Sequence, residues 1–324
     1  MPTPYRPFVA PAGYPEDLPS AEVKRRFLSL LGDFAQPSVP LNLRVTEETE
    51  LPGDLIQQRV EYDVEPHETV PALHLFCRGL ADDAPGVLCI HAHGGDAIFP
   101  HGKAYHAHPQ PDDPTQYTYR AALAGFRVLA PDALCFGERS IPGGWYFMDE
   151  INAHCELVAR GKSFAWKSVW DNSRALEALE LLGCTSLGSM GWSGGSTQNY
   201  ILTAVNPKVK AAACFFSFAT LRHQFYQYRL GHCLYHYVPN MVSAGIDWDQ
   251  VVALAAPRKL LFGWGGQDGG SPEEMYRAFV DAVEARCRAE GLPPSLVCHE
   301  EADIAHDLTE SMLTDALRFL QQNL

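Results

Sequence analysis

The sequence is short of positive charge. Its 324 residues include 25 Lys and Arg against 39 Asp and Glu, which gives a formal net charge of -14. Charge of this sign repels the phosphates of nucleic acids and the headgroups of anionic lipids. We therefore expect the partners of this protein to include neither nucleic acid nor a membrane surface.

Long apolar segments and paired cysteines are also missing. No apolar run approaches the roughly 18 residues that a membrane-spanning helix needs, and the first residues lack the apolar stretch of a signal peptide. The nine cysteines are odd in number and scattered, and no two of them form a C-x-x-C pair. This spacing argues against a disulfide framework or a thiolate zinc site. Scattered thiols are typical of a reducing compartment, so we expect a cytoplasmic protein.

Residues 1–50 predict a proline-rich arm followed by a helix. Six of the first 19 residues are proline, which fixes φ and removes a hydrogen-bond donor, so the arm should lie extended on a surface. A helix should begin at Ser20 and end near Gly32, because an apolar stripe follows Ser20, made of Val23, Phe27, Leu28, Leu30 and Leu31. Residues 51–324 then predict one domain, with a cap-like insertion at about 215–250.

From residue 86 onward, short apolar runs alternate with segments of helical periodicity. Such runs are typical of strands buried on both faces of a parallel sheet. The alternation predicts an α/β protein with a mostly parallel, doubly wound sheet and helices on both of its faces. Two earlier segments, 55–64 and 70–76, resemble a strand pair at a sheet edge. The expected buried strands are 86–90, 126–130, 187–190, 209–216 and 259–263, the segment 295–300 is a candidate for the last strand, and the expected helices are 117–124, 163–182, 196–204, 272–290 and 309–324.

A G-x-S-x-G motif at residues 191–195 follows the strand expected at 187–190 and precedes a helix. In this context small residues let the turn tighten, and Ser193 is exposed at the top of the sheet. A serine in an ordinary turn is the alternative, since the motif is short. A nucleophilic serine needs a base that accepts its proton and an acid that orients the base.

Asp268 and His306 stand where these two partners are expected. Asp268 lies in a glycine-rich loop after the strand at 259–263, and His306 lies in the loop before the last helix. His299 also follows Asp268 in the chain, but it falls within a strand. An Asx turn is the alternative role for Asp268. The order serine, acid, histidine is that of α/β-hydrolases.

Tetrahedral intermediates also need N–H donors aimed at the oxyanion. Gly194, directly after the nucleophile, is the first expected donor. The second should come from the loop after the strand at 86–90, where the sequence reads His-Ala-His-Gly-Gly at 91–95. Two alignments are open, with His93 or Gly95 as the donor. We prefer His93, because the first histidine of this segment directly follows the strand.

Further segments resemble a known family over about residues 86–320. They are LAGFRVLAPD at 123–132, FGER at 136–139, WDNSRAL at 170–176, YVP at 237–239 and APR at 256–258. With the G-x-S-x-G motif, they resemble the α/β-hydrolase superfamily, and within it the dienelactone-hydrolase-related group of acetyl xylan esterases. The resemblance implies the α/β-hydrolase fold, a triad of Ser193, Asp268 and His306, and ester hydrolysis.

The chain also departs from that family. Dienelactone hydrolases proper have cysteine where Ser193 stands, and Ala92 replaces the usual glycine of a His-Gly pair. The histidine-rich loop at 101–108 has no counterpart that we can assign. These differences concern the substrate more than the chemistry.

We therefore predict a serine hydrolase that cleaves a carboxylic ester of a small molecule through an acyl-enzyme. This makes the protein a carboxylesterase, and acetylated sugars are the substrates that the resemblance suggests. The chemistry needs no cofactor. Whether the chain pairs with copies of itself stays open.

Two rival hypotheses are kept. His91 and His93, with Asp96 and the nearby histidines, could begin a metal-dependent hydrolase site, because i and i+2 residues of a strand share a face. One loop would then supply nearly all of the ligands. A non-catalytic binding protein of the same fold is the second rival, since fold alone does not prove an activity. The presence of all three triad residue types argues against it.

Two groups of residues carry weaker signals. Nine aromatic residues lie within 215–248 and should overhang the nucleophile, either as a substrate wall or as packing of a lid. Structural ion pairs are expected at Glu138 and Arg139, with a substrate contact as the alternative, and between Asp171 and Arg174 on a helix.

Overall fold

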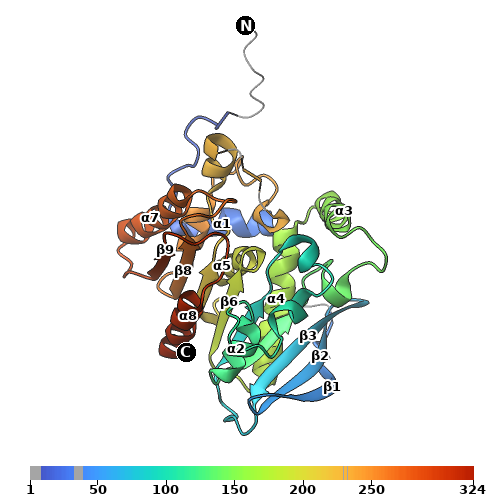
Figure 1. The fold of residues 1–324 in the computed structure, drawn as a ribbon. Helices are drawn as coiled ribbons and strands as arrows, with labels where there is room; N and C mark the ends of the chain where they lie inside the picture. The colour runs from blue at the N-terminus through green and yellow to red at the C-terminus, as the bar shows by residue number, and fades with distance from the viewer. Residues whose placement is uncertain (1–8, 33–38, 229, 232) are drawn as a thin grey trace.

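A nine-stranded sheet runs through the computed structural model, which describes residues 9–32, 39–228, 230–231 and 233–324 (Figure 1). The strand order is β1-β2-β3-β5-β4-β6-β7-β8-β9. The pairs β1–β2, β2–β3 and β3–β5 are antiparallel, and the other pairs are parallel. The strands span Arg44–Leu51 (β1), Leu55–Glu65 (β2), Glu68–Cys77 (β3), Gly86–Ile90 (β4), Arg127–Pro131 (β5), Leu187–Trp192 (β6), Val209–Phe215 (β7), Lys259–Gly265 (β8) and Leu296–Glu301 (β9).

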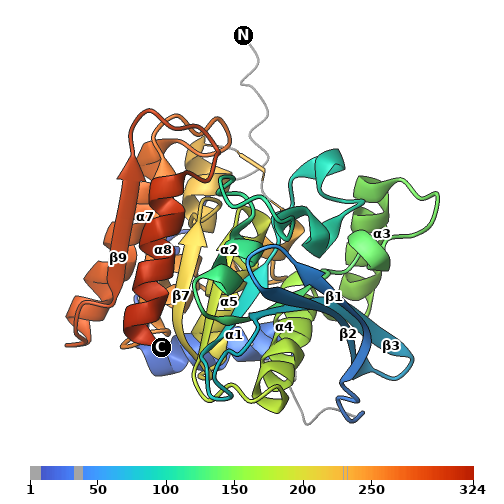
Figure 2. The same cartoon turned by 60° about the horizontal axis from the view of Figure 1, so that its bottom comes forward.

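Helices cover both faces of the sheet (Figures 1 and 2). α2 and α8 pack on one face, and α4, α5, α6 and α7 lie on the other, with α1 against α6. Within the described ranges every helix is too short or too polar to span a bilayer. The helices span Ser20–Leu31 (α1), Tyr117–Leu123 (α2), Tyr146–Ala159 (α3), Phe164–Leu181 (α4), Gly194–Val205 (α5), Trp248–Ala253 (α6), Glu273–Ala289 (α7) and Glu310–Asn323 (α8).

The expected α/β core is confirmed. All five residues of β4 are buried, because helices cover both faces of the central strands. The predicted helices begin where cap residues stand: the side chains of Ser163 and Thr309 accept N–H bonds from the first turns of α4 and α8. Each buried strand and each helix predicted from residue 86 onward is present, with ends shifted by a few residues.

Three elements are not predicted from the sequence pattern: β1, α3 and α6. Six of the eight residues of β1 are exposed, so this strand shows no alternation. It lies outside β2, which means that the predicted pair 55–64 and 70–76 forms but is not the sheet edge. The domain boundary expected between residues 50 and 51 falls inside β1. α6 has six residues, too few to show a period.

The proline-rich arm is described from residue 9, and residues 1–8 lie outside the described residues. Residues 9–19 contain no helix or strand and pack beside the start of α6. The Glu16 N–H donates to Gly245 O over 2.8 Å, and the Gln250 side chain donates to Glu16 O over 2.8 Å. The described part of the arm therefore lies on the domain, as expected.

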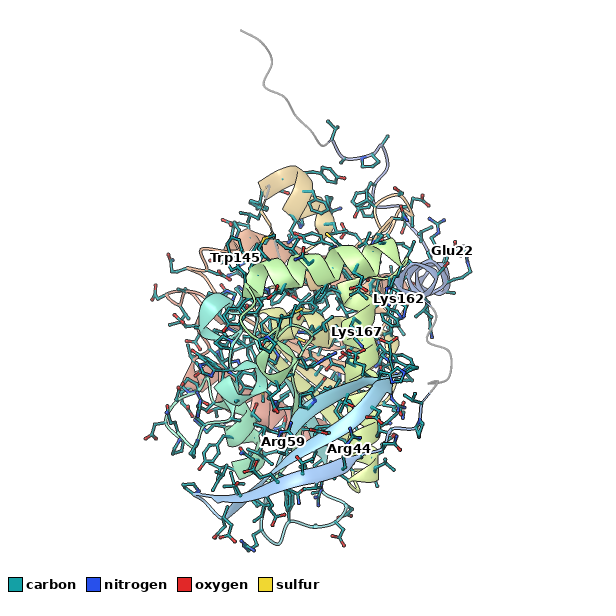
Figure 3. All side chains as sticks on the ribbon, turned by 90° about the vertical axis from the view of Figure 1, so that its right-hand side faces the viewer. Glu22, Arg44, Arg59, Trp145, Lys162 and Lys167 are labelled. Atoms are coloured by element: carbon teal, nitrogen blue, oxygen red, sulfur yellow. The ribbon has the colours of Figure 1, made fainter. Side chains whose placement is uncertain are left out.

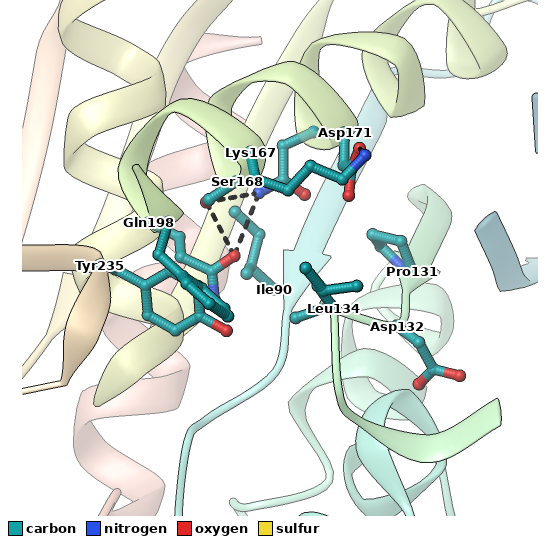
Figure 4. A pocket seen from close by; sticks show the side chains of 12 residues that line it. Ile90, Pro131, Asp132, Leu134, Lys167, Ser168, Asp171, Gln198 and Tyr235 are labelled. Atoms are coloured by element: carbon teal, nitrogen blue, oxygen red, sulfur yellow. Dashed lines mark hydrogen bonds and ion pairs between the residues drawn. The ribbon is translucent and has the colours of Figure 1, made fainter. Parts of the chain in front are cut away.

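A buried cluster of ion pairs joins α4 to the turn after β2 and to the loop after β5. Lys167 Nζ lies 2.7 Å from Glu68 Oε2 and 2.8 Å from Asp171 Oδ1. Arg139 Nη1 lies 2.8 Å from Asp171 Oδ2. Lys167 lies on the inward side of α4, and Figure 4 shows it with Asp171 at the wall of a small pocket (Figures 3 and 4).

The expected pair of Asp171 with Arg174 is wrong. Asp171 points to the buried cations Lys167 and Arg139, whereas Arg174 pairs with Glu177 at the same i, i+3 spacing, so tertiary packing and not helical spacing decides which neighbours pair. Glu138 and Arg139 are in structural ion pairs as expected, although not with each other. The observed partners are Lys167 and Arg139 for Asp171, Glu177 for Arg174, Lys103 and Arg59 for Glu138, and Asp171 and Glu68 for Arg139.

Replacing Lys167 with methionine should lower the free energy of unfolding by about 3 kcal/mol, because it leaves Asp171 and Glu68 with Arg139 as the one cation that they share. Lys208→Met is the matched control, since Lys208 pairs with Glu180 on the surface and its loss should cost about 0–1 kcal/mol. Urea denaturation measures both. Equal losses in the two variants would contradict the buried role of Lys167.

Candidate active site

The turn between β6 and α5 holds Ser193 at the carboxyl end of the sheet. Its backbone has φ 56° and ψ -121°, a sparsely populated conformation for a residue with a Cβ. A Cβ on Gly191 would lie 2.4 Å from Gly195 O, and a Cβ on Gly195 would lie 2.2 Å from Ile90 O. Glycine at both positions therefore lets the turn close and present the serine.

Ser193, His306 and Asp268 form a hydrogen-bonded chain. His306 Nε2 lies 2.9 Å from Ser193 Oγ, and His306 Nδ1 lies 2.9 Å from Asp268 Oδ2. The three residues follow β6, β9 and β8 respectively. Because these strands are parallel, their carboxyl ends meet at one edge of the sheet. The structure thus brings together the three residues that the sequence singles out.

The Asp268 carboxylate is buried among donors. Its Oδ1 accepts the Gly270 N–H over 2.8 Å, and its Oδ2 accepts the Tyr276 hydroxyl as well as His306. Burial raises the pKa of this carboxyl, but hydrogen bonds from His306, Tyr276 and Gly270 outweigh it, so the pKa lies below the usual aspartate value. Asp268 therefore stays ionised. Tyr276 shows no signal in the sequence, because it reaches Asp268 from α7 by tertiary packing.

The loop after β4 lies against the start of α5. A Cβ on Gly194 would lie 2.6 Å from His93 Cβ and 3.1 Å from the His93 backbone nitrogen. Among the described residues, neither the N–H of His93 nor that of Gly194 has an acceptor. The alternative donor, Gly95, has no atom within 4 Å of its Cβ position. The geometry therefore favours His93 over Gly95 as the partner of Gly194.

His91 and His106 are buried and hold this loop in place. His91 Nε2 accepts the Ala133 N–H over 3.0 Å, and His106 Nε2 accepts the Ala92 N–H over 3.2 Å. The opposite ring nitrogen of His106 donates to Thr115 O over 2.7 Å. Burial lowers the pKa of both histidines, that of His106 to about 3. Both rings are therefore neutral at physiological pH.

The ligand set of the metal hypothesis is not assembled. His91 is turned to the Ala133 N–H, and His93 Nε2 lies 2.7 Å from Glu150 Oε2. His101 and His108 are exposed. In the part of the chain that the structure describes, no group of three His, Cys, Asp or Glu side chains is arranged to hold a metal ion.

The pocket at Ser193 has a volume of about 430 Å³. The aromatic-rich segment 215–248 contributes Ser217, Gly231, Cys233 and Leu234 to its wall, and none of the nine described aromatic residues of that segment. Five of the nine rings are buried, Phe218 and Trp248 among them at 0% exposure, and the other four are half-buried, so the part of the wall that this segment forms is not aromatic. Phe147 and Glu150 of α3, which the sequence pattern does not mark, also line the pocket.

Comparison with known proteins places this geometry in a fold. No family model matches the chain. The chain is 24% identical to YtaP of Bacillus subtilis (strain 168) over 315 residues, which cover 93% of this chain and 99% of YtaP. YtaP is named as a hydrolase.

Solved esterases have the same architecture. A glucuronoyl esterase from Solibacter usitatus is similar with a TM-score of 0.67 at 16% identity, over 93% of this chain and 92% of its own. Acetyl xylan esterase 1 from Thermoanaerobacterium sp. is similar with a TM-score of 0.64 at 14% identity, over 98% of this chain and 96% of its own. The chain therefore has the α/β-hydrolase fold.

Ser193→Gly should be more stable than Ser193→Ala by about 1 kcal/mol, because glycine adopts the observed φ and ψ without strain. Both variants lack the hydroxyl, so the difference isolates the backbone. Guanidinium denaturation compares their free energies of unfolding. An alanine variant as stable as the glycine variant would show that the turn is not strained.

The wild-type protein should lose stability relative to His106→Gln as the pH falls. The pKa of His106 is about 3 in the folded state, so its stabilising effect is complete above the ordinary histidine value and is lost on acidification. The free energy of unfolding of wild type should fall relative to that of His106→Gln by about 1.4 kcal/mol per pH unit below pH 6. Urea denaturation at several pH values between 8 and 5 measures it. A constant difference would refute a buried, neutral His106.

Proposed function

We propose that this protein of α/β-hydrolase fold is a serine hydrolase that cleaves a carboxylic ester of a small molecule through an acyl-enzyme. The observation that carries the proposal is the chain from Ser193 Oγ through His306 to Asp268, with 2.9 Å at each step. A serine hydroxyl becomes a useful nucleophile when a base accepts its proton and a third group orients that base. Each part is present here.

In this mechanism Ser193 Oγ attacks the ester carbonyl while His306 Nε2 takes its proton. The negative oxygen of the tetrahedral intermediate accepts hydrogen bonds from the N–H groups of Gly194 and His93. His306 then protonates the departing alcohol, which leaves an acyl group on Ser193. Water, activated by the same histidine, releases the acid and restores the serine.

Asp268 acts through His306. Its carboxylate accepts the Nδ1 proton of His306, which leaves Nε2 free to face Ser193 and stabilises the positive ring that forms during the reaction. The lowered pKa of Asp268 keeps this charge available wherever His306 is neutral enough to act as base. No residue of this mechanism calls for a cofactor.

The named neighbours support the carboxylic-ester class. They include a glucuronoyl esterase and an acetyl xylan esterase, and the second name favours deacetylation of acetylated sugars as the finer proposal. A pocket of about 430 Å³ suits a small ester. Eight of the nine cysteines, all but Cys233, are free thiols in the described structure, which supports a reducing, cytoplasmic location.

A fluorophosphonate probe tests the proposal by intact mass. Wild type should gain one adduct, Ser193→Ala should gain none, and a chelator should change neither result, because the triad needs no metal. Ser217→Ala is the matched control, since Ser217 Oγ is the neighbouring hydroxyl at 3.5 Å and its loss should leave the adduct in place.

Two outcomes would overturn the proposal. Folded wild type that gains no adduct favours the non-catalytic binding protein. Ester hydrolysis that the chelator abolishes favours the metal-dependent hydrolase.

A further inference from the structure

Helix α3 buries a carboxylate beside two exposed aromatic rings. Trp145, directly before it, and Phe147, in its first turn, are 75% and 52% exposed (Figure 3). Glu150 is the one buried residue of this helix, whose fourteen residues are all described. A carboxylate is costly to bury, whereas aromatic rings are the groups that usually fill a core. Tyr146, Ala153 and Leu157 already pack α3 on the domain through apolar contacts, so the helix does not need a buried glutamate to hold its place.

Glu150 belongs to the wall of the pocket at Ser193. It lies one helical turn after Phe147, so the two side chains leave the same face of α3, and both line this pocket. Glu150 Oε2 lies 2.7 Å from His93 Nε2. Glu150 Oε1 is buried and has no hydrogen-bond partner among the described residues. A buried oxygen of this kind calls for a donor.

The charge of Glu150 is poorly balanced. The pocket wall, as far as the structure describes it, contains neither lysine nor arginine. His93 is the ion-pair partner that the described residues offer to Glu150. A carboxylate accepts hydrogen bonds and donates none, and in a partly desolvated pocket it repels a second negative charge strongly. The pocket is therefore built for a hydrogen-bond donor and against an anion.

We propose that Glu150 determines substrate specificity, which rests on the proposed ester hydrolysis. Its carboxylate accepts a hydrogen bond from a hydroxyl group that the substrate carries near the ester bond. The enzyme therefore prefers uncharged, hydroxyl-bearing esters and discriminates against anionic ones. A site built to bind a hydroxyl rejects the analogue that lacks it, because the buried acceptor is then left unpaired.

Matched esters test this on wild type. On the acyl side the set is para-nitrophenyl butyrate, its β-hydroxybutyrate counterpart and the hemisuccinate, which is anionic. On the alcohol side it is ethyl acetate and ethylene glycol monoacetate. Each kcat/KM is divided by the rate constant of alkaline hydrolysis, so that intrinsic reactivity cancels. This normalised kcat/KM should be about tenfold higher for the hydroxylated member of at least one pair than for its counterpart. It should be about tenfold lower for the hemisuccinate than for the butyrate.

Two variants of Glu150 separate the effect of its charge from the effect of its side-chain length. Glu150→Gln keeps the volume and a contact to His93 but removes the charge, so both selectivity ratios should fall about fivefold or more. Glu150→Asp keeps the charge and shortens the side chain, so it should retain the discrimination against hemisuccinate and lose the preference for hydroxyl. Glu156→Gln, at an exposed position of the same helix, is the matched control and should leave both ratios in place.

The outcomes distinguish this inference from the proposed function. An enzyme that labels at Ser193 but shows no preference for hydroxylated esters, or prefers the anionic one, overturns the role of Glu150 and leaves ester hydrolysis standing. If Glu150→Gln lowers kcat/KM for every ester by one factor, Glu150 merely positions His93 and the inference is overturned. A protein that neither labels nor hydrolyses any ester removes the proposed function, and this inference with it. If the glutamine variant does not fold, the wild-type ratios and Glu150→Asp decide.

Discussion

The close backbone packing between the turn after β6 and the loop after β4 is the constraint on which the rest of the site depends. Gly195 lies so near Ile90 O, and Gly194 so near His93, that a side chain at either glycine would force the two segments apart. This contact closes the turn and holds Ser193 at positive φ. It also brings side by side two N–H groups that have no acceptor among the described residues. The proposed nucleophile and the proposed oxyanion donors are thus positioned by the same contact.

Buried polar contacts then fix what surrounds that turn. His106 and His91 bind backbone N–H groups on both sides of the loop after β4, and the Tyr117 hydroxyl donates to Ile90 O over 2.7 Å. Neutral rings suit this role, because burial disfavours a charged imidazole in the same place. Farther out, the ion pairs around Lys167 and Asp171 anchor the loop after β5 to α4. The site is therefore held in place by buried hydrogen bonds and ion pairs whose residues do not take part in the proposed chemistry.

Short sequence patterns predicted the central strands, the serine turn and the three residues that meet there. Unbroken apolar runs marked the central strands, because burial on both faces leaves no polar positions. The glycines of the G-x-S-x-G motif marked the turn that holds Ser193. Asp268 and His306 could be chosen because each follows a strand near the carboxyl edge of the sheet, where loops converge. That the three side chains meet at hydrogen-bond distance follows from the parallel register of β6 to β9.

The sequence by itself determined the order of the buried strands and of the helices between them, the serine turn and the choice of Asp268 and His306 as the proposed acid and base. The tertiary structure alone decided which other residues reach the site. Tyr276 arrives from α7, and Phe147 and Glu150 arrive from α3. The aromatic-rich segment, which looked suited to an aromatic substrate wall, lines the pocket with other residues and buries five of its nine rings. The physical reason is that periodicity reports burial along one element, whereas a pocket wall is assembled from elements distant in sequence whose contacts leave no periodic trace.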